Sequence, residues 1–262
     1  MMKQKYQYKT ISGLTSFLKL LLFAGIALGL LEIGSLIMEY ELLGRENFSD
    51  QEGEQNDKRE MLVGLAGLFL FVVTAVVFGI WIVRANKNAR ALGAKNLSAS
   101  PGWALGYFFI PILNLWKPFK AMNELWYASH DPRNWEMAFK EKSQVVGRWW
   151  GFFVLQFPAA QLAEKSWDAA ETLEQMQKAD LYYMGAAIFE IVLCVFSIAL
   201  ISKIAIAQEN NDFGPPVDSR VKVTNGKHKG KFGIVVANDG RNITIEDRSG
   251  RKLVLPKHDF KL

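Results

Sequence analysis

The chain has 262 residues, of which 50% are hydrophobic, and its 31 basic and 26 acidic residues give a formal net charge of +5. Its single cysteine, Cys194, excludes an internal disulfide framework and a thiolate metal cluster. Because the three histidines are dispersed and no zinc-protease, nucleophile-elbow, P-loop or dinucleotide-binding motif occurs, we expect neither an enzyme nor a cofactor or metal site.

Four long apolar runs predict membrane-spanning helices. At a rise of about 1.5 Å per residue, each is long enough to cross a hydrocarbon core of about 30 Å. Helices are expected because lipid offers no hydrogen-bond partner to an unpaired backbone amide. We expect the first run to be retained as a span rather than cleaved as a secretory signal, and its Gly25 and Gly29 allow another helix to approach. The runs cover residues 20–38, 61–83, 145–163 and 181–201.

The charges of the connecting segments alternate and predict how the chain is threaded. The basic head, with Lys9 and Lys19, is followed by segment 39–60, which contains eight acidic and three basic residues. Segment 84–148 has ten basic and four acidic residues, segment 164–180 is acidic again, and the tail is basic. Since Lys and Arg near span ends are retained in the cytoplasm, both termini should be cytoplasmic in a plasma membrane.

The largest connector, residues 84–144, is predicted to form an insert on the cytoplasmic face. The helix of the second run should continue to Gly93, which is placed to terminate it. Arg84, Lys87 and Arg90 recur every third residue and would lie at headgroup depth, where they could contact an anionic lipid or a phosphate ligand. The alternative is a stop-transfer cluster that only sets the topology.

Two elements are predicted inside the insert. Residues 103–116 are apolar except for Asn114 and are interrupted by Pro111, so we expect a re-entrant or interfacial element. Residues 117–130 show the period of an amphipathic helix, which would lie on the membrane surface or pack against the spans. Its predicted apolar side carries Phe119, Met122, Leu125 and Trp126, and its predicted polar side carries Lys117 and Lys120, two further candidate lipid contacts, with Asn123 and Glu124.

Two carboxylates inside apolar runs, Glu32 and Glu190, are the candidates for an activity. A charged carboxylate at mid-helix costs about 2.5 to 3.5 kcal/mol, so each should be protonated, paired or hydrated. With Gln156 and Gln161 of the third run, they could form a shared polar cavity that senses or passes a proton or a small cation. The alternative is a pair of neutral acids that are hydrogen-bonded between helices.

The composition changes after the fourth run. Residues 208–216 predict a polar linker, and residues 217–262 alternate apolar and polar side chains at the period of β-strands. Paired apolar side chains on one strand face are predicted at positions 221 and 223, 234 and 236, 243 and 245, and 253 and 255. With turn signals at Asn225-Gly226, Asp239-Gly240 and Ser249-Gly250, these strands predict a small β-barrel.

Four motifs occur in order in the second run and the insert: W-x-x-R-A-x-x-N-A-x-x-L-G-A at 81–94, S-P-G-W-A at 100–104, F-I-P-I-x-N-L-W-K-P at 109–118 and E-x-W-x-A-S-x-D-P at 124–132. Together they resemble a bacterial multi-pass membrane family whose name is a domain of unknown function. The resemblance covers residues 15–205 and implies a bacterial plasma-membrane protein with four spans. It implies no activity, cofactor or catalytic residue.

Residues 221–235, with their glycines and Lys231, are similar to a KOW motif, the strand-loop-strand unit of small barrels in ribosomal and transcription-associated proteins. This resemblance implies nucleic-acid or protein contact through Lys227, His228, Lys229 and Lys231. The alternative is a basic loop beside an anionic leaflet, which needs no nucleic acid. Only Phe232 can serve as an aromatic platform, so a protein partner is favoured over nucleic acid.

The sequence therefore predicts an all-α polytopic membrane bundle of four transmembrane helices with a re-entrant or amphipathic insert, followed by a small cytoplasmic β-barrel. The favoured function is a non-enzymatic scaffold or sensor, whose insert contacts the anionic inner leaflet and whose tail binds a partner through Lys227, Lys229 and Lys231. One alternative is a small cation or proton channel or transporter that uses Glu32 and Glu190. A lipid-modifying enzyme is a further alternative, which would need polar groups converging at the insert.

Overall fold

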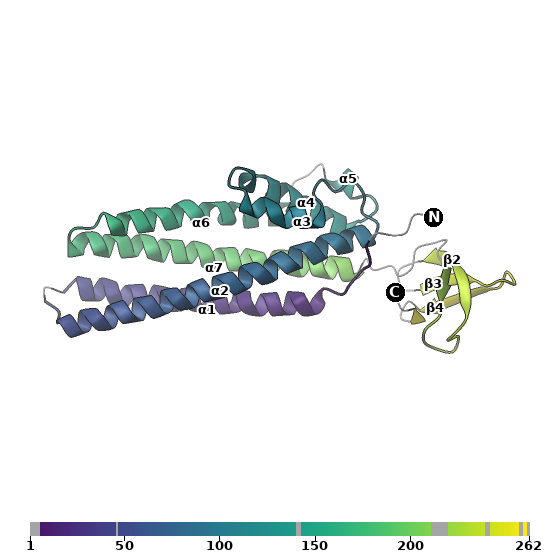
Figure 1. Ribbon diagram of the computed structural model, residues 1–262, viewed down its shortest axis with the longest axis horizontal. Coiled ribbons are helices and arrows are strands. Elements are labelled where there is room, and N and C mark those ends of the chain that lie inside the picture. The colour runs from purple at the N-terminus through teal and green to yellow at the C-terminus, as the bar shows by residue number, and fades with distance from the viewer. Residues whose placement is uncertain are drawn as a thin grey trace.

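The computed structural model describes residues 6–45, 47–139, 143–210, 220–238, 242–256 and 259–260. Four long helices lie side by side, short helices pack against one end of them, and a small β-sheet lies beyond that end (Figure 1). We name the end with the short helices the insert end, and the opposite end, where α1 joins α2 and α6 joins α7, the loop end. The long helices are α1 (Ser12–Leu43), α2 (Asp50–Ala91), α6 (Gln144–Asp168) and α7 (Leu173–Asn210).

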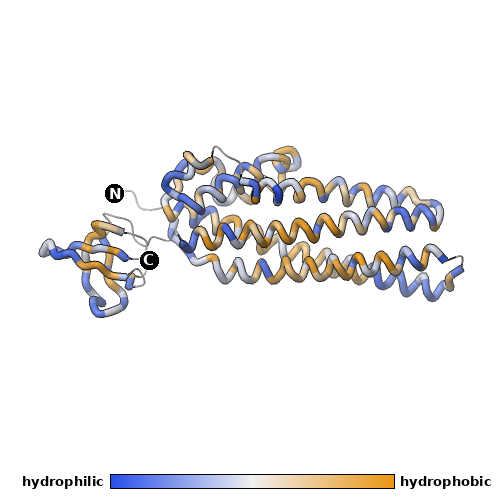
Figure 2. The backbone as a smooth tube through the Cα atoms, turned by 180° about the vertical axis from the view of Figure 1, so that it is seen from behind, coloured by the Kyte–Doolittle hydropathy of each residue, from blue (hydrophilic) through white to orange (hydrophobic). Residues whose placement is uncertain are grey.

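Three of the long helices, α1, α2 and α7, are long and apolar enough to cross a membrane. They match three of the four predicted spans and indicate a membrane protein. Figure 2 shows hydrophobic residues along the length of the helices and hydrophilic residues at both ends of the bundle. The remaining predicted span corresponds to α6, a continuous helix of 25 residues that includes Pro158. Its Arg148, Gln156 and Gln161 lower its hydropathy, so a fourth crossing stays a prediction.

Helix α2 begins and ends where its sequence provides caps. Ser49 and Glu52 form a capping box, in which each side chain accepts a hydrogen bond from the backbone amide of the other residue. At the insert end Gly93 has a φ of +111°, and the amide of Ala94 donates to the carbonyl of Ala89 at 3.0 Å, which is the Schellman arrangement. The helix therefore continues past the apolar run and stops at Gly93, as predicted.

The long helices pack in the order α2, α1, α7, α6. Gly29 lets α1 and α7 approach closely, since a Cβ atom at this position would lie 2.9 Å from Cγ1 of Ile191. A Cβ atom at Gly25 would lie 3.3 Å from Sγ of Cys194. The predicted close approach at these two glycines is therefore made within the chain, between α1 and α7.

The insert end holds the main hydrophobic core. Trp81, Trp149 and Ile204 are almost fully buried there. Both indoles have partners, because Trp81 Nε1 donates to Thr15 Oγ1 at 2.9 Å and Trp149 Nε1 donates to Ser197 Oγ at 3.1 Å. By contrast, 0% of the most apolar window of α2 is buried within the chain. That stretch of α2 is therefore left to contact lipid.

The insert is built from short elements packed beside the long helices. Helix α4 has the predicted bounds and contacts α2, α6 and α7, with Met122 and Leu125 buried as predicted. The elements are α3 (Pro101–Gly106), the 3-10 helices η1 (Tyr107–Phe109) and η2 (Leu113–Leu115), α4 (Lys117–His130) and α5 (Trp135–Ala138). The segment 103–116 is thus broken into short turns rather than forming a crossing helix.

The predicted polar side of α4 is wrong at two positions. Asn123 and Glu124 are only 3% and 4% exposed. The amide of Ser98 donates to Oε2 of Glu124 at 2.8 Å, and the amide of Ser143 donates to Oδ1 of Asn123 at 3.1 Å. The flanking loops fold over this side of the helix, and the two side chains satisfy loop amides that would otherwise be buried without partners.

The tail forms a four-stranded antiparallel sheet in the order β1, β2, β3, β4. Val223, Val235, Ile243 and Ile245 form its fully buried centre, and an isolated bridge joins Val223 to Phe260. Closure into a barrel stays a prediction. The strands are β1 (Arg220–Lys222), β2 (Phe232–Asn238), β3 (Asn242–Glu246) and β4 (Lys252–Pro256).

Two details of the predicted tail are wrong. Ile234 and Val236 were expected on the inner face of their strand, but Val235 is the buried residue and Ile234 is exposed. The run Ile-Val-Val is apolar on both faces, and the pairing of β2 with β3 is irregular between Val235 and Ala237. The predicted linker begins too early, because α7 continues to Asn210. The rest of that linker and the Asp239-Gly240 turn lie outside the described residues.

Candidate functional site

Five of the six exposed large apolar residues recorded in the described part of the insert come from the segment 103–116, and the sixth is Met137. Trp103 is 54% exposed, Phe109 77%, Ile112 70%, and Leu115 and Trp116 are exposed as well. The backbone is broken around Pro111, so these side chains project from short turns. Figure 1 shows the insert lying alongside the insert end of the long helices rather than beyond it. An apolar surface at this level, bordered by tryptophans, is typical of a membrane interface.

The basic residues predicted to contact lipid differ in the exposure of their side chains and in the contacts that these side chains make. Lys87 and Lys120 are exposed, and Arg84 and Lys117 are half-buried. Lys120 Nζ lies 3.9 Å from Glu124 Oε1, and Lys117 Nζ lies 5.7 Å from the centre of the Tyr107 ring. Apart from these two contacts, no hydrogen bond or ion pair engages the four side chains within the described residues. They therefore remain candidate headgroup contacts, two on the end of α2 and two in the first turn of α4.

Arg90 differs from the other predicted basic contacts. Its Nη2 donates to the carbonyls of Ala99 at 2.6 Å and Leu97 at 3.3 Å, and its Nε donates to Asn86 Oδ1 at 3.1 Å. The guanidinium therefore binds the loop that leaves α2 to the end of that helix. This gives Arg90 a structural task that its spacing in the sequence did not indicate.

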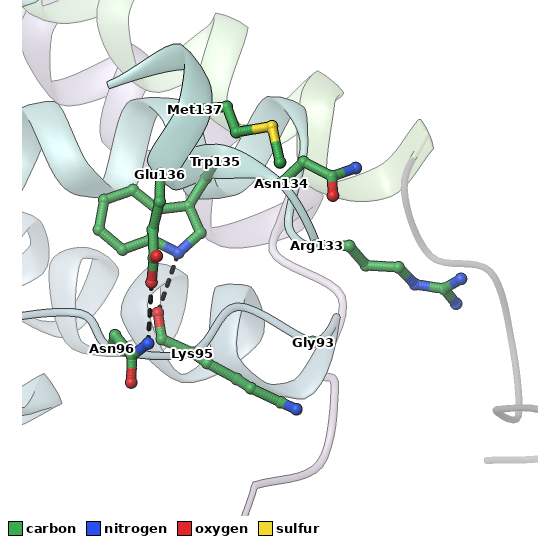
Figure 3. A pocket seen from close by; sticks show the side chains of 8 residues that line it. All are labelled: Gly93, Lys95, Asn96, Arg133, Asn134, Trp135, Glu136 and Met137. Atoms are coloured by element: carbon green, nitrogen blue, oxygen red, sulfur yellow. Dashed lines mark hydrogen bonds between the residues drawn. The ribbon is translucent and has the colours of Figure 1, made fainter. Parts of the chain in front are cut away.

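A hollow of about 550 Å³ lies between the end of α2 and α5 (Figure 3). Its wall is held together by two hydrogen bonds, from Trp135 Nε1 to the carbonyl of Lys95 and from Asn96 Nδ2 to Glu136 Oε1, both 2.9 Å long. Among the described residues, its lining offers amide, basic and acidic groups but no serine, cysteine or histidine. It is lined by Gly93, Lys95, Asn96, Arg133, Asn134, Trp135, Glu136 and Met137.

The predicted intramembrane carboxylates come together on α1 and α7. Glu190 acts electrostatically on Glu32, and the two helices are in close contact at Gly29. Gln156 is half-buried and Gln161 is exposed on α6. Within the described residues, no hydrogen bond joins either glutamine to either glutamate. The structure therefore brings the two acids into electrostatic range of each other, whereas the part that Gln156 and Gln161 would play in a shared cavity stays a prediction.

A polar cluster at the loop end was not predicted. It joins Ser35 and Glu39 of α1, Asn56, Arg59 and Glu60 of α2, and Asp180 of α7, and we name it the loop-end cluster. Ser35 Oγ donates to Glu60 Oε1 at 2.5 Å and accepts from Arg59 Nε at 2.7 Å. Asn56 Nδ2 donates to Glu39 Oε1 at 2.8 Å, and Arg59 also donates to Asn56 Oδ1.

Asp180 is the exceptional member of the loop-end cluster. It is 0% exposed, and neither of its carboxylate oxygens has a hydrogen-bond partner among the residues that the structure describes. Glu39 and Glu60 are the charged groups that act on it. The signal was present in the sequence, because Glu39, Glu60 and Asp180 each stand at the outer margin of an apolar run. From the sequence alone, these three acids were counted only among the charges of the connecting segments.

In the tail, the predicted lysines occupy the turn between β1 and β2. Lys227, Lys229 and Lys231 are all exposed, and the turn is supported by Gly226 and Gly230, whose φ angles are +73° and +91°. The structure thus presents three lysines on one short loop.

The exposed face of the sheet also carries apolar side chains, of which the sequence had indicated only Phe232, as an aromatic platform. Phe232, Ile234 and Val254 are 59%, 46% and 67% exposed. Lys222 Nζ lies 5.3 Å from the centre of the Phe232 ring, and the pair Arg220 and Ile234 is directly cross-strand. We name this mixed apolar and basic surface the outer sheet face.

The chain matches a known protein-family model. The family model described as Domain of unknown function (DUF4328) matches residues 45–205. No curated protein and no solved structure matches the chain. The matched region includes the second, third and fourth predicted spans, the whole insert and the loop-end cluster residues of α2 and α7.

Proposed function

The chain belongs to the family named Domain of unknown function (DUF4328), and we propose that it is a non-enzymatic scaffold or sensor of a bacterial plasma membrane. In this proposal the chain crosses the membrane four times, with both termini and the insert in the cytoplasm. The insert contacts the anionic inner leaflet, and the tail binds a partner. The exposed apolar and aromatic surface of residues 103–116 beside lysines is the observation that carries the proposal.

The four-span topology is supported by packing and by charge. Helix α6 contacts α7 extensively and lies beside it in the bundle, so a membrane that contains α7 would also contain α6. The connectors at the loop end are acidic and the insert is basic, which fits retention of the insert in the cytoplasm. A reporter fused after Leu262 should be active in the cytoplasm, and periplasmic activity would contradict this topology.

Contact with the inner leaflet is supported by the exposed apolar surface of residues 103–116 together with the positive charge of the lysines. Trp103 and Trp116 have the amphipathic rings that favour the headgroup level. Lys87, Lys117 and Lys120 lie nearby in the same insert, and each basic residue near an anionic surface contributes about 1 kcal/mol to attraction. Together the two terms would hold the insert at the inner leaflet.

The test of lipid contact is retention of anionic lipid by the purified full-length chain. We expect native mass spectrometry to detect bound phosphatidylglycerol, and we expect the combined variant Lys87→Gln, Lys117→Gln, Lys120→Gln to lose most of it. Lys58→Gln is the matched control, because Lys58 is exposed at the loop end and forms only an i,i+4 pair with Glu54. Equal retention by all three proteins would contradict the proposal.

The partner site of the tail is proposed on the lysine turn and the outer sheet face. Phe232 and Ile234 give an apolar centre, and Lys222, Lys227 and Lys231 give a basic surround, which suits a protein surface that carries acidic residues. Photo-crosslinking from position 232 of the full-length chain should capture a protein, and capture should fall in the variant Lys227→Glu, Lys231→Glu. Recovery of RNA or DNA instead would favour the nucleic-acid alternative.

A channel or transporter that uses Glu32 and Glu190 is the second candidate, and the proximity of the two acids on α1 and α7 favours it. The insert end argues against a polar pathway through the bundle, because Leu18, Trp81 and Ile201 are fully buried there in a continuous apolar core. Ion flux into liposomes that is lost in Glu32→Gln and Glu190→Gln but kept in Glu41→Gln would establish this function in place of the scaffold.

A further inference from the structure

The loop-end cluster contains a carboxyl group that cannot remain both charged and isolated. Asp180 is fully buried, and in the described part of the chain neither oxygen accepts a hydrogen bond. Transfer of an isolated carboxylate from water into a protein interior is so costly that the group neutralises or finds a counter-ion. Asp180 therefore needs a proton or a cation to occupy its position.

The groups around Asp180 make ionisation harder. On α1 the neighbouring charged group is Glu39, whose Oε1 accepts from the Asn56 amide. On α2 it is Glu60, which forms an ion pair with Arg59 at 3.2 Å. Arg59 is the basic residue of the cluster and forms no ion pair with Asp180. Two acids therefore face Asp180 from two different helices.

Acidic groups of α6 act on the turn of α7 that follows Asp180. Tyr183 lies one turn further along α7, and the groups that act on this tyrosine from α6 are Glu164 and Asp168. Gln177, one turn before Asp180, donates to the carbonyl of Tyr40 at 2.7 Å and so joins α7 to α1 at this level. Asp180 thus lies where α7 is held against α1, and α6 brings further negative charge toward this part of α7.

We propose that the Asp180 carboxyl is a proton-binding site whose occupancy controls the packing of α7 against α1 and α2 at the loop end. A protonated carboxyl has an O–H donor, which a carboxylate lacks, and can donate to a neighbouring acid. Two carboxyl groups that share a buried site hold a proton more tightly than either would alone. When the proton leaves to water, Asp180 repels Glu39 and Glu60, and the three helices separate at this end.

A proton fits this site better than a divalent metal ion. In the part of the chain that the structure describes, no group of three or more histidine, cysteine, aspartate or glutamate side chains is arranged to hold a metal ion. Arg59 and Asn56 already engage Glu60 and Glu39, which leaves fewer oxygens for coordination. Which compartment exchanges protons with Asp180 depends on the proposed topology. The existence of the proton-binding site does not depend on it.

The direct test is infrared spectroscopy of the full-length chain in lipid nanodiscs. Near neutral pH we expect the carbonyl-stretch region of protonated carboxylic acids to contain a component that is lost in Asp180→Asn and retained in Asp57→Asn, an exposed acid of α2 at the same end; any components from Glu32 and Glu190 should remain in both variants. A band that persists unchanged in Asp180→Asn at every pH would overturn the proposal. The result of this test does not depend on the proposed four-span topology or on the proposed lipid contact. Its failure can therefore be distinguished from the failure of either proposal.

A second variant keeps the test decisive if Asp180→Asn fails to fold. Glu39→Gln removes one neighbouring charge, so we expect the proton affinity of Asp180 to fall about tenfold, which moves loss of the band by about one pH unit toward acid. No movement would count against the site. Addition of Mg²⁺ or Ca²⁺ at constant pH should leave the band unchanged, and replacement of the band by a divalent ion would identify a metal site instead.

Discussion

The two ends of the bundle bury polar groups in different ways. At the insert end, Asn88 exchanges two hydrogen bonds with the backbone of Lys9, at 2.8 and 3.0 Å, and the buried carboxylate of Glu124 accepts from a loop amide. At the loop end, Asp180 is buried without a hydrogen-bond partner, and acids face it from α1 and α2. The insert end is thus built to hold one structure, whereas the loop end contains groups whose charge can change.

This difference separates two kinds of buried polar interaction. A buried amide bonded to backbone groups keeps the same charge at every physiological pH, so its contribution to stability is constant. A cluster of acids contributes according to how many protons it binds, so its contribution depends on pH. The two ends of the molecule should therefore respond differently to substitution and to pH.

The largest effect is expected from breaking the core of the insert end. Trp149 is 2% exposed, and its indole donates to Ser197, so Trp149→Ala should cost about 3 to 5 kcal/mol of unfolding free energy. Denaturant unfolding in micelles, followed by circular dichroism, measures the change. Trp103→Ala is the control, because Trp103 is 54% exposed and should contribute little to folding. Equal losses in both variants would show that the insert end is not the rigid part.

The next effect concerns the loop that Arg90 holds to α2. Arg90→Gln removes hydrogen bonds to the carbonyls of Leu97 and Ala99, and we expect a cost of about 2 kcal/mol. Increased hydrogen exchange of residues 94–100 should accompany the loss. Lys87→Gln, an exposed change on the same helix, should alter stability by less than about 0.5 kcal/mol. If Arg90→Gln behaves like Lys87→Gln, the guanidinium does not support the loop.

The sequence predicted those features that depend on local pattern. Helix α4 was predicted at its observed bounds, because Pro118 and Asp131 mark its ends and its apolar period is clear. The end of α2 at Gly93 was predicted because glycine readily adopts a positive φ. The hollow lined by Arg133 and Trp135 was not predicted, since it arises only when two separate loops meet.

The features that were missed depend on contacts between distant segments. Asn123 and Glu124 look solvent-facing on a helical wheel, and only the loops at Ser98 and Ser143 show why they are buried. The loop-end cluster joins residues as far apart as Ser35 and Asp180. The sequence showed each acid beside an apolar run but not that helix packing brings those acids together.

A matched pair of asparagines can sharpen the comparison between the two ends. Asn56→Ala removes the donor to Glu39, and Asn88→Ala removes the partner of the Lys9 backbone. Each should cost about 1 to 2 kcal/mol. The cost of Asn56→Ala should be larger at pH 8 than at pH 5, because its amide favours the ionised form of Glu39, whereas the cost of Asn88→Ala should be constant. Unfolding at the two pH values measures both, and equal pH dependence would remove the distinction between the ends.

The smallest effect is expected in the tail, where Asp247 is a half-buried counterpart of Asp180 whose Oδ1 accepts three hydrogen bonds. The Ser249 hydroxyl and the amides of Ser249 and Arg251 donate to its carboxylate at 2.5, 2.8 and 3.1 Å, and these bonds lower the pKa of Asp247. Its contribution to the turn is therefore present above the unfolded pKa of about 3.9 and is lost as pH falls through the lower folded pKa.

The Asp247 turn should thus weaken in acid, whereas the loop end should weaken as pH rises. Amide chemical shifts of Ser249 and Arg251 across an acid titration measure the first change, and Asp247→Asn should abolish it. Stability of the bundle across an alkaline titration measures the second, which Asp180→Asn should abolish. Because the two residues have the same carboxyl group, opposite signs can arise only from their surroundings, three donors in one case and none in the other. A loop end that instead weakens in acid would mean that Asp180 is stabilised as a carboxylate.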